Sequence, residues 1–69
     1  MNRFIERFTE LIKEKGEQQK ELAKKINRTP QLITNWKRGD SEPCIDDLIK
    51  LADYFNVCID YLVGRQDYM

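Results

Sequence analysis

Apolar residues recur at helical spacing in five successive stretches of the chain, with polar, proline- or glycine-containing breaks between them. The first stretch predicts a helix from about Asn2 or Arg3 to Lys15, ended by Gly16. Its main apolar face consists of Phe4, Phe8 and Leu11. Ile5 and Ile12 form a second stripe, which we interpret as the edge of a wide face that packs on a small core. The alternative for this stripe is contact with another subunit or with the C-terminal helix.

Residues 18–39 are typical of two short helices joined by a tight turn. The first of these helices starts near Gln19. Its apolar face consists of Leu22, Ala23 and Ile26. The helical pattern then breaks at Asn27, a residue type that tolerates the left-handed backbone conformation in which helices often end. We therefore expect the turn between the two helices to begin there.

The second helix of this pair has clear signals at both ends. Thr29 is a good N-cap, and Pro30 suits the first helical position, where its missing N–H costs nothing. The helix is expected to run to about Arg38, with Gly39 as its C-terminal stop. Its inward side chains are Ile33 and Trp36.

The outward face of this second helix carries the most informative side chains. Gln31 and Asn35 are four residues apart and share that face, and an amide side chain can pair with adenine through two hydrogen bonds. Lys37 and Arg38 are suited to flanking phosphates. The face carries no acid before Asp40. The alternative is an ordinary solvated helix, because amides are common on protein surfaces.

The C-terminal third of the chain predicts two further helices, from Cys44 to Phe55 and from Ile59 to Val63. Asn56 and Gly64 are expected to end them. The inward stripe of the longer helix is predicted to be Ile45, Leu48, Leu51, Ala52 and Phe55. We expect residues 1–69 to form one domain with its core at 4–64, followed at 65–69 by a frayed tail or the stump of a linker.

The order and spacing of these signals resemble the Cro and phage-repressor type (XRE family) of helix-turn-helix protein. The two-helix motif matches at Gly16, Gln19, Leu22, Ala23, Ile26, Thr29, Ile33, Thr34, Trp36 and Gly39. The last two helices match at Pro43, Leu48, Leu51, Ala52, Phe55, Val57 and the run Asp60-Tyr61-Leu62-Val63-Gly64. The resemblance covers roughly residues 4–64. It implies an all-α, compact five-helix, lambda-repressor-like DNA-binding domain with the helix-turn-helix as helices 2 and 3.

The resemblance also implies a function and a set of site residues. The expected function is sequence-specific binding of double-stranded DNA by a homodimeric transcriptional regulator, expected to be a repressor. Its recognition helix, about Pro30 to Arg38, would lie in the major groove of an inverted-repeat operator. The base-reading residues would be Gln31, Asn35 and Thr34. Phosphate or bracing contacts would come from Gln19, Lys20, Thr29, Lys37 and Arg38. The dimer contact would come from Tyr61, Leu62 and Val63.

The chain departs from the family pattern at several positions. Gln18 stands where relatives often have a Ser or Thr cap. Pro30 stands where many relatives have a polar base-reading residue, so its side chain offers a base only steric contact or contact with a thymine methyl group. Asp40 and Glu42 lie in a loop where relatives often carry basic phosphate contacts. We therefore expect the affinity for DNA to depend on salt concentration, but not to an extreme degree.

The distribution of charge supports a nucleic-acid partner more clearly than the net charge does. The chain has 12 basic and 12 acidic side chains, so its formal net charge is zero. Residues 1–39 hold ten basic against five acidic side chains, net +5, whereas residues 40–69 hold two against seven, net −5. This uneven distribution of charge suggests that one half of the chain binds a partner, and the basic half contains the predicted recognition helix.

Length and composition exclude several other classes of protein. A chain of 69 residues allows one small domain. It has no histidine, no phosphate-cradling glycine loop and no nucleophile beside a base, so we expect no enzymatic activity and no cofactor. Cys44 and Cys58 are too few for a metal site, and we expect reduced, structural thiols rather than a redox switch. The sequence has neither a membrane span nor a signal peptide, so we expect a cytoplasmic protein.

The sequence is therefore compatible with two functions. The favoured one is the homodimeric DNA-binding regulator. The alternative is a protein-interaction module on the same scaffold, such as an antitoxin or antirepressor-like adaptor. The zero net charge, Pro30 and the acidic pair Asp40 and Glu42 support this alternative. Replacing Gln31 and Asn35 by alanine distinguishes the two, because only DNA binding depends on them.

Overall fold

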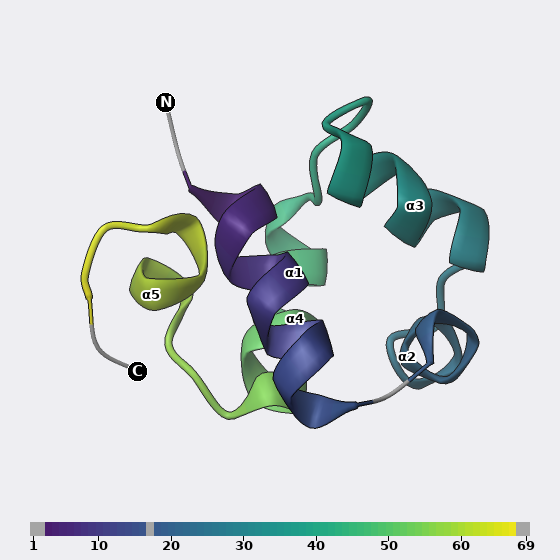
Figure 1. The fold of residues 1–69 in the computed structure, drawn as a ribbon, viewed down its shortest axis with the longest axis horizontal. Coiled ribbons are helices and arrows are strands. Elements are labelled where there is room, and N and C mark those ends of the chain that lie inside the picture. Colours follow the sequence, from purple (N-terminus) through teal and green to yellow (C-terminus); the bar gives the residue numbers. More distant parts are fainter. Residues whose placement is uncertain (1–2, 17, 68–69) are drawn as a thin grey trace.

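The computed structural model describes residues 3–16 and 18–67 of the chain. Within these residues it contains five helices and no strand (Figure 1). The helices are α1 (Phe4–Lys15), α2 (Gln19–Lys25), α3 (Pro30–Arg38), α4 (Ile45–Phe55) and α5 (Ile59–Val63). The all-α, five-helix prediction is confirmed. The predicted cap Asn2 and the last two residues of the predicted tail lie outside the described residues.

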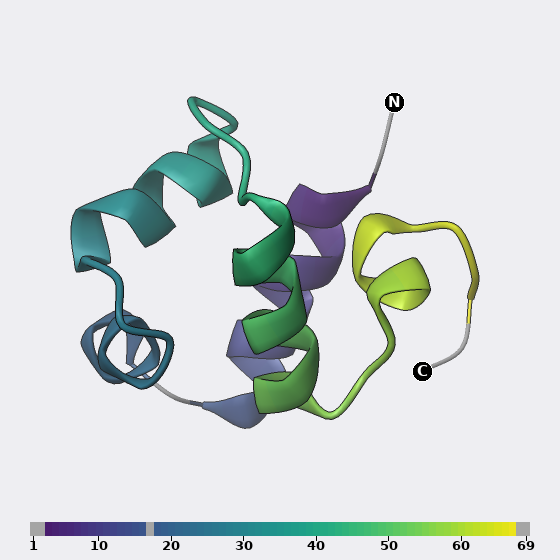
Figure 2. The same ribbon diagram turned by 180° about the vertical axis from the view of Figure 1, so that it is seen from behind.

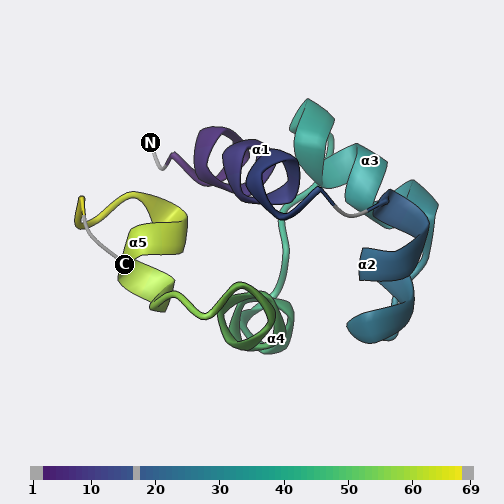
Figure 3. The ribbon, with the colours of Figure 1, turned by 60° about the horizontal axis from the view of Figure 1, so that its bottom comes forward.

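The five helices surround one hydrophobic core (Figure 3). α1 and α4 lie on opposite sides of this core, while α5 contacts both of them at one end and the α2–α3 pair packs on α1 at the other. Figure 2 shows from behind that the yellow segment that follows α5, up to residue 67, lies on the α5 side. The helix-turn-helix pair and α5 therefore present separate surfaces at opposite ends of the domain.

Side chains predicted to face inward form most of the core. They include Phe4, Phe8, Leu11, Leu22, Ala23, Ile26, Ile33, Trp36 and Leu51. Phe8 and Trp36 are almost fully buried and meet edge to face, with ring centroids 6.0 Å apart. Phe4 stacks on Phe8 at 5.0 Å. This aromatic cluster joins α1 to α3, the predicted recognition helix, and so fixes α3 to the rest of the domain.

The predicted ends of the helices are confirmed where local sequence determines them. Asn27 adopts a left-handed conformation (φ 59°) in the turn between α2 and α3, and Asn56 (φ 57°) ends α4. The hydroxyl oxygen of Thr29 accepts a hydrogen bond of 3.2 Å from the N–H of Leu32, and Pro30 is the first residue of α3. These local contacts determine where the recognition helix begins.

The predicted inward stripe of α4 is wrong at its N-terminal end. Ile45 is 74% exposed, whereas Asp47 is 3% exposed. The Asp47 carboxylate accepts hydrogen bonds from the N–H and thiol of Cys44 and forms an ion pair of 3.1 Å with Arg28. These partners hold Asp47 inward, and Ile45 turns to the surface because positions two apart on a helix differ by about 200° in direction. The rest of the stripe, Leu48, Leu51, Ala52 and Phe55, is buried or half-buried.

Residues 65–67 are attached to the domain, so the predicted frayed tail is wrong for this segment. The N–H of Arg65 donates a hydrogen bond of 2.7 Å to the carbonyl oxygen of Asp60. The guanidinium of Arg7, which is 7% exposed, forms an ion pair of 3.3 Å with Asp67. Arg7 therefore ties the segment that follows α5 to α1.

Candidate nucleic-acid interface

Gln19 connects the first turn of α2 to the recognition helix α3. Its side-chain N–H groups donate to the carbonyl oxygen of Pro30 at 2.9 Å and to the hydroxyl oxygen of Thr34. Its amide oxygen accepts a hydrogen bond of 3.4 Å from Lys37. Both ends of one amide thus hold α3, and the small Ala23 of α2 is buried in the core. This is the geometry that the bracing role implied for Gln19 requires.

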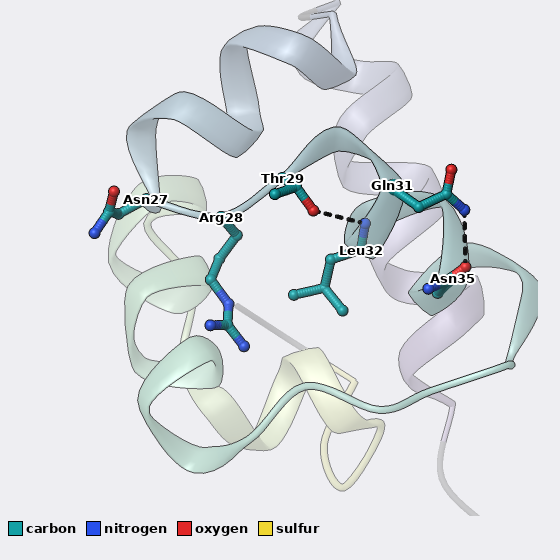
Figure 4. A pocket seen from close by; sticks show the side chains of 6 residues that line it. All are labelled: Asn27, Arg28, Thr29, Gln31, Leu32 and Asn35. Carbon is teal, nitrogen blue, oxygen red and sulfur yellow. Dashed lines mark hydrogen bonds between the residues drawn. The ribbon is translucent and has the colours of Figure 1, made fainter.

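Gln31 and Asn35 lie side by side on the outer face of α3 (Figure 4). Gln31 is exposed and Asn35 is half-buried. The Gln31 side-chain N–H donates a hydrogen bond of 3.1 Å to the Asn35 side-chain oxygen. Together they border an open groove that is also lined by Asn27, Arg28, Thr29 and Leu32. The outer face of α3 therefore offers amide donors and acceptors of the kind that bind base edges.

Thr34 faces α2 rather than the open side of α3. Its hydroxyl donates a hydrogen bond of 3.2 Å to the carbonyl oxygen of Pro30 and accepts one from Gln19. A hydroxyl group has only one proton to donate, so none is left for an acceptor on a base edge. The predicted base-reading role of Thr34 has no support in this geometry, and Thr34 contributes instead to the bracing of α3.

The basic residues of the α2–α3 pair differ in how freely they can meet a phosphate. Lys20 is exposed on α2, whereas Lys37 is half-buried and bound to Gln19. Arg38 forms an ion pair of 3.4 Å with Asp40, in which both side chains are more than half exposed. Because exposed ion pairs contribute little to stability, a phosphate can replace Asp40 as the partner of Arg38.

An ion pair between Arg28 and Asp47 joins the turn of the helix-turn-helix to α4. The sequence pattern does not predict this ion pair, because the two residues are nineteen positions apart and periodicity does not reveal such a contact. One signal was present: Asp47 lies four residues before Leu51, which is 0% exposed, and so shares the inward face of α4. A second link runs from Lys50 to the carbonyl oxygen of Ile26 at 3.4 Å.

Two of the three predicted dimer-contact residues belong to the core of the domain. Leu62 is 0% exposed and Tyr61 is 8% exposed, whereas Val63 is half-buried. The Tyr61 ring lies against the guanidinium of Arg7, 4.2 Å from the ring centroid. The prediction is wrong for Leu62, which has no surface to offer a second subunit. Among the described residues, the exposed large apolar side chains are Ile5, Ile45 and Ile49.

A family model described as helix-turn-helix matches residues 9–62. The chain belongs to this helix-turn-helix family. The matched range contains all of α2, α3 and α4, so it includes the braced recognition helix and the α4 residues that hold its turn. The family resemblance seen in the sequence motifs is confirmed.

Two relatives are named as regulators of transcription. The HTH-type transcriptional regulator ImmR of Bacillus subtilis (strain 168) is 36% identical over 61 residues, which are 88% of this chain and 48% of that protein. The crystal structure of a transcriptional regulator from Listeria innocua matches with a TM-score of 0.88 at 34% identity, over 93% of this chain and 60% of that one. This chain therefore spans about half the length of the curated relative that it matches.

Two further properties hold for residues 3–16 and 18–67. None of their helices combines the length and the apolar character that a membrane crossing requires. Their His, Cys, Asp and Glu side chains do not gather into any group of three or more that could hold a metal ion.

Proposed function

We propose that this chain is a sequence-specific DNA-binding regulator, acting as a repressor, that binds an inverted-repeat operator as a homodimer. The observation that carries the proposal is the placement of Gln31 and Asn35, whose amides lie together on the outer face of a helix that Gln19 and the Thr29 cap hold in place. The names of the two relatives support the same function. The proposal assigns no catalytic role to any residue.

The charge of the helix-turn-helix pair favours DNA as its partner. Residues 18–39 carry six basic side chains and one acidic side chain. Arg28 and Arg38 form ion pairs with Asp47 and Asp40 of the acidic C-terminal half, which reduces this excess of positive charge but does not remove it. Such a surface attracts the phosphate backbone from a distance and provides the sequence-independent part of binding.

We assign phosphate contacts to Lys20, Thr29, Lys37 and Arg38, on either side of the base-reading residues. The Thr29 hydroxyl oxygen accepts the cap hydrogen bond from Leu32, which leaves its proton for a phosphate oxygen. Gln19 and Thr34 act as bracing residues. Phosphate contacts position a protein on the duplex, while base specificity comes from contacts with the base edges in the groove.

The homodimer is part of the proposal because a two-fold operator requires two recognition helices about 34 Å apart, one helical turn of DNA. Of the predicted contact residues, Val63 retains exposed surface at the α5 end of the domain, and Tyr61 retains little. Dimerisation would double the number of base contacts. Two amides in each half-site alone give only modest specificity.

A protein-interaction module is the second candidate. It is favoured by the Arg38–Asp40 ion pair, because Asp40 neutralises a charge that a dedicated DNA-binding surface would leave free. In this reading the outer face of α3 would bind another protein, and DNA binding would be weak and nonspecific.

The double variant Gln31→Ala/Asn35→Ala tests the proposal. Its affinity for duplexes that the wild-type protein enriches from a random library should fall at least about 30-fold, because each of the two amide contacts contributes roughly 1–3 kcal/mol to base discrimination. Fluorescence anisotropy at physiological salt measures this change. Retained affinity for the enriched duplexes would overturn the assignment of the base-reading residues.

The matched control is Glu10→Ala/Lys13→Ala, an exposed pair on α1 whose removal leaves the net charge unchanged. This variant should bind the enriched duplexes like the wild-type protein. Circular dichroism should show the same helical content in all three proteins, so that a loss of binding is not a loss of folding.

A further inference from the structure

The hydrogen bond between Gln31 and Asn35 makes the two amides dependent on each other. It spans one helical turn at 3.1 Å on the outer face of α3 (Figure 4). Gln31 is exposed and Asn35 only half-buried, so water could satisfy both groups without this bond. Amide pairs at this spacing stabilise a helix only slightly. The main effect of the bond is therefore on which atoms the two amides present to a ligand.

The atoms left free by this bond differ between the two residues. An amide side chain has two N–H donors and an oxygen with two lone pairs. Gln31 uses one N–H on Asn35 and keeps its oxygen and its other N–H, the acceptor–donor pair that matches N6 and N7 of adenine. Asn35 has one lone pair of its oxygen engaged and keeps both N–H donors. In the major groove two donors match the acceptors of guanine (O6 and N7) or thymine (O4), whereas adenine presents a donor (N6) beside its N7 acceptor and cytosine presents its N4 donor.

We propose that Gln31 and Asn35 read DNA as one coupled unit. Asn35 holds the Gln31 amide in the orientation that selects adenine, and it reads an adjacent base through its own N–H donors. The unit therefore selects adenine opposite Gln31 and guanine or thymine opposite Asn35. This inference rests on the proposed DNA-binding function. Asn35 is a positioning residue for the first base and a reading residue for the second.

Two physical effects make the coupling matter when DNA is bound. A free Gln31 side chain would lose rotamer freedom on binding, whereas one held by Asn35 has already lost part of it. The duplex also removes water from around the amide pair, and a hydrogen bond is stronger in a less polar environment. The helix beneath is itself held by Gln19. The coupled amides are therefore oriented relative to the whole domain.

Selection from a random duplex library with three proteins tests the proposal: the wild type, Asn35→Asp and Asn35→Ala. The aspartate carboxylate can still accept the Gln31 N–H but has no donor. Asn35→Asp should therefore keep adenine opposite Gln31 and change the second base to cytosine, whose amino group a carboxylate accepts. Asn35→Ala should lose the second preference. It should also weaken the adenine preference roughly 2- to 10-fold, at a base that position 35 does not contact.

Gln31→Ala is the complementary variant. It should lose the adenine preference at the base that Gln31 reads, and because it frees the oxygen of Asn35 for pairing with adenine, it should broaden the second preference from guanine or thymine to include adenine. Circular dichroism confirms that each variant is folded. An unchanged adenine preference in Asn35→Ala would show two independent reading residues and overturn the coupling while leaving the proposed function intact. Failure of the folded wild-type protein to enrich any motif would overturn both.

Discussion

The side-chain amide of Gln19 donates a hydrogen bond of 2.9 Å to the carbonyl oxygen of Pro30. This contact joins the first residue of α2 to the first residue of α3. Pro30 has no side-chain donor or acceptor for a base, yet its main chain receives both the Gln19 amide and the Thr34 hydroxyl. The start of the recognition helix is thus held by contacts within the protein.

Gln19→Ala should lower both stability and DNA affinity. It removes the two hydrogen bonds that Gln19 donates to α3 and the longer one that it accepts from Lys37. With about 1 kcal/mol for each donated bond, we expect a loss of about 1–2 kcal/mol in the free energy of unfolding and about tenfold in affinity. Gln19→Glu is the matched variant, because it keeps an acceptor for Lys37 but cannot donate to Pro30. Urea unfolding and anisotropy titration measure the two effects. Wild-type affinity in both variants would show that the bracing contact is dispensable.

Asp47→Ala should destabilise the domain by about 2–3 kcal/mol. The Asp47 carboxylate is nearly fully buried and accepts hydrogen bonds from Cys44 and Arg28. The Arg28 side chain is 42% exposed, so it can be hydrated when its partner is removed, and this limits the loss. A double-mutant cycle with Arg28→Ala should give a coupling energy of about 1 kcal/mol in urea unfolding. Additive effects of the two changes would contradict a direct interaction.

Arg7→Ala should lower the free energy of unfolding by about 2 kcal/mol, through loss of the contact with the Tyr61 ring and of hydrogen bonds to residues 66 and 67. For a domain of this size that is a fall of roughly 8–16 °C in Tm. Asp67→Ala should leave Tm near the wild-type value, because the Asp67 side chain is 92% exposed. Equal falls in Tm would mean that the ion pair, rather than the Tyr61 contact, is the source of the stability.

Asp40→Asn should raise DNA affinity about 3- to 10-fold at low salt, because it releases Arg38 and removes a negative charge near the phosphates. The gain should shrink as salt screens the charges. Asp53→Asn, an exposed change on α4, makes the same change in net charge away from α3. Anisotropy titrations at several salt concentrations compare the two variants. Equal gains from both would rule out a specific role for the Arg38–Asp40 pair.

The ends of the recognition helix were predictable from the sequence, whereas the side of α4 that faces the core at its N-terminal end was not, and the difference has a physical cause. The Thr29 cap and the left-handed Asn27 depend on residues within a few positions. The burial of Asp47 in place of Ile45 depends on Arg28, which lies in another element. An isoleucine is normally the more buried of the two residue types, so local pattern favours the wrong side chain.

For the candidate site, too, the sequence predicted some features and not others. Helical spacing and the family resemblance were enough to place Gln31 and Asn35 on the outer face and to select Gln19 as a bracing residue. The hydrogen bond between the two reading amides depends on their rotamers, and spacing does not predict these. Burial of Leu62 also escaped prediction, because a five-residue helix is too short to show which of its apolar positions face the core.

Selection of bound duplexes from a random-sequence library by the wild-type protein, at physiological salt, tests the central claim most directly. Nonspecific binding is weak under these conditions, with Kd roughly 10⁻⁴ to 10⁻⁶ M, so enrichment reports recognition of sequence. We predict a palindromic motif whose half-sites are centred about 34 Å apart and contain adenine. No enrichment by a protein that circular dichroism shows to be folded would contradict the account and favour a protein partner for α3.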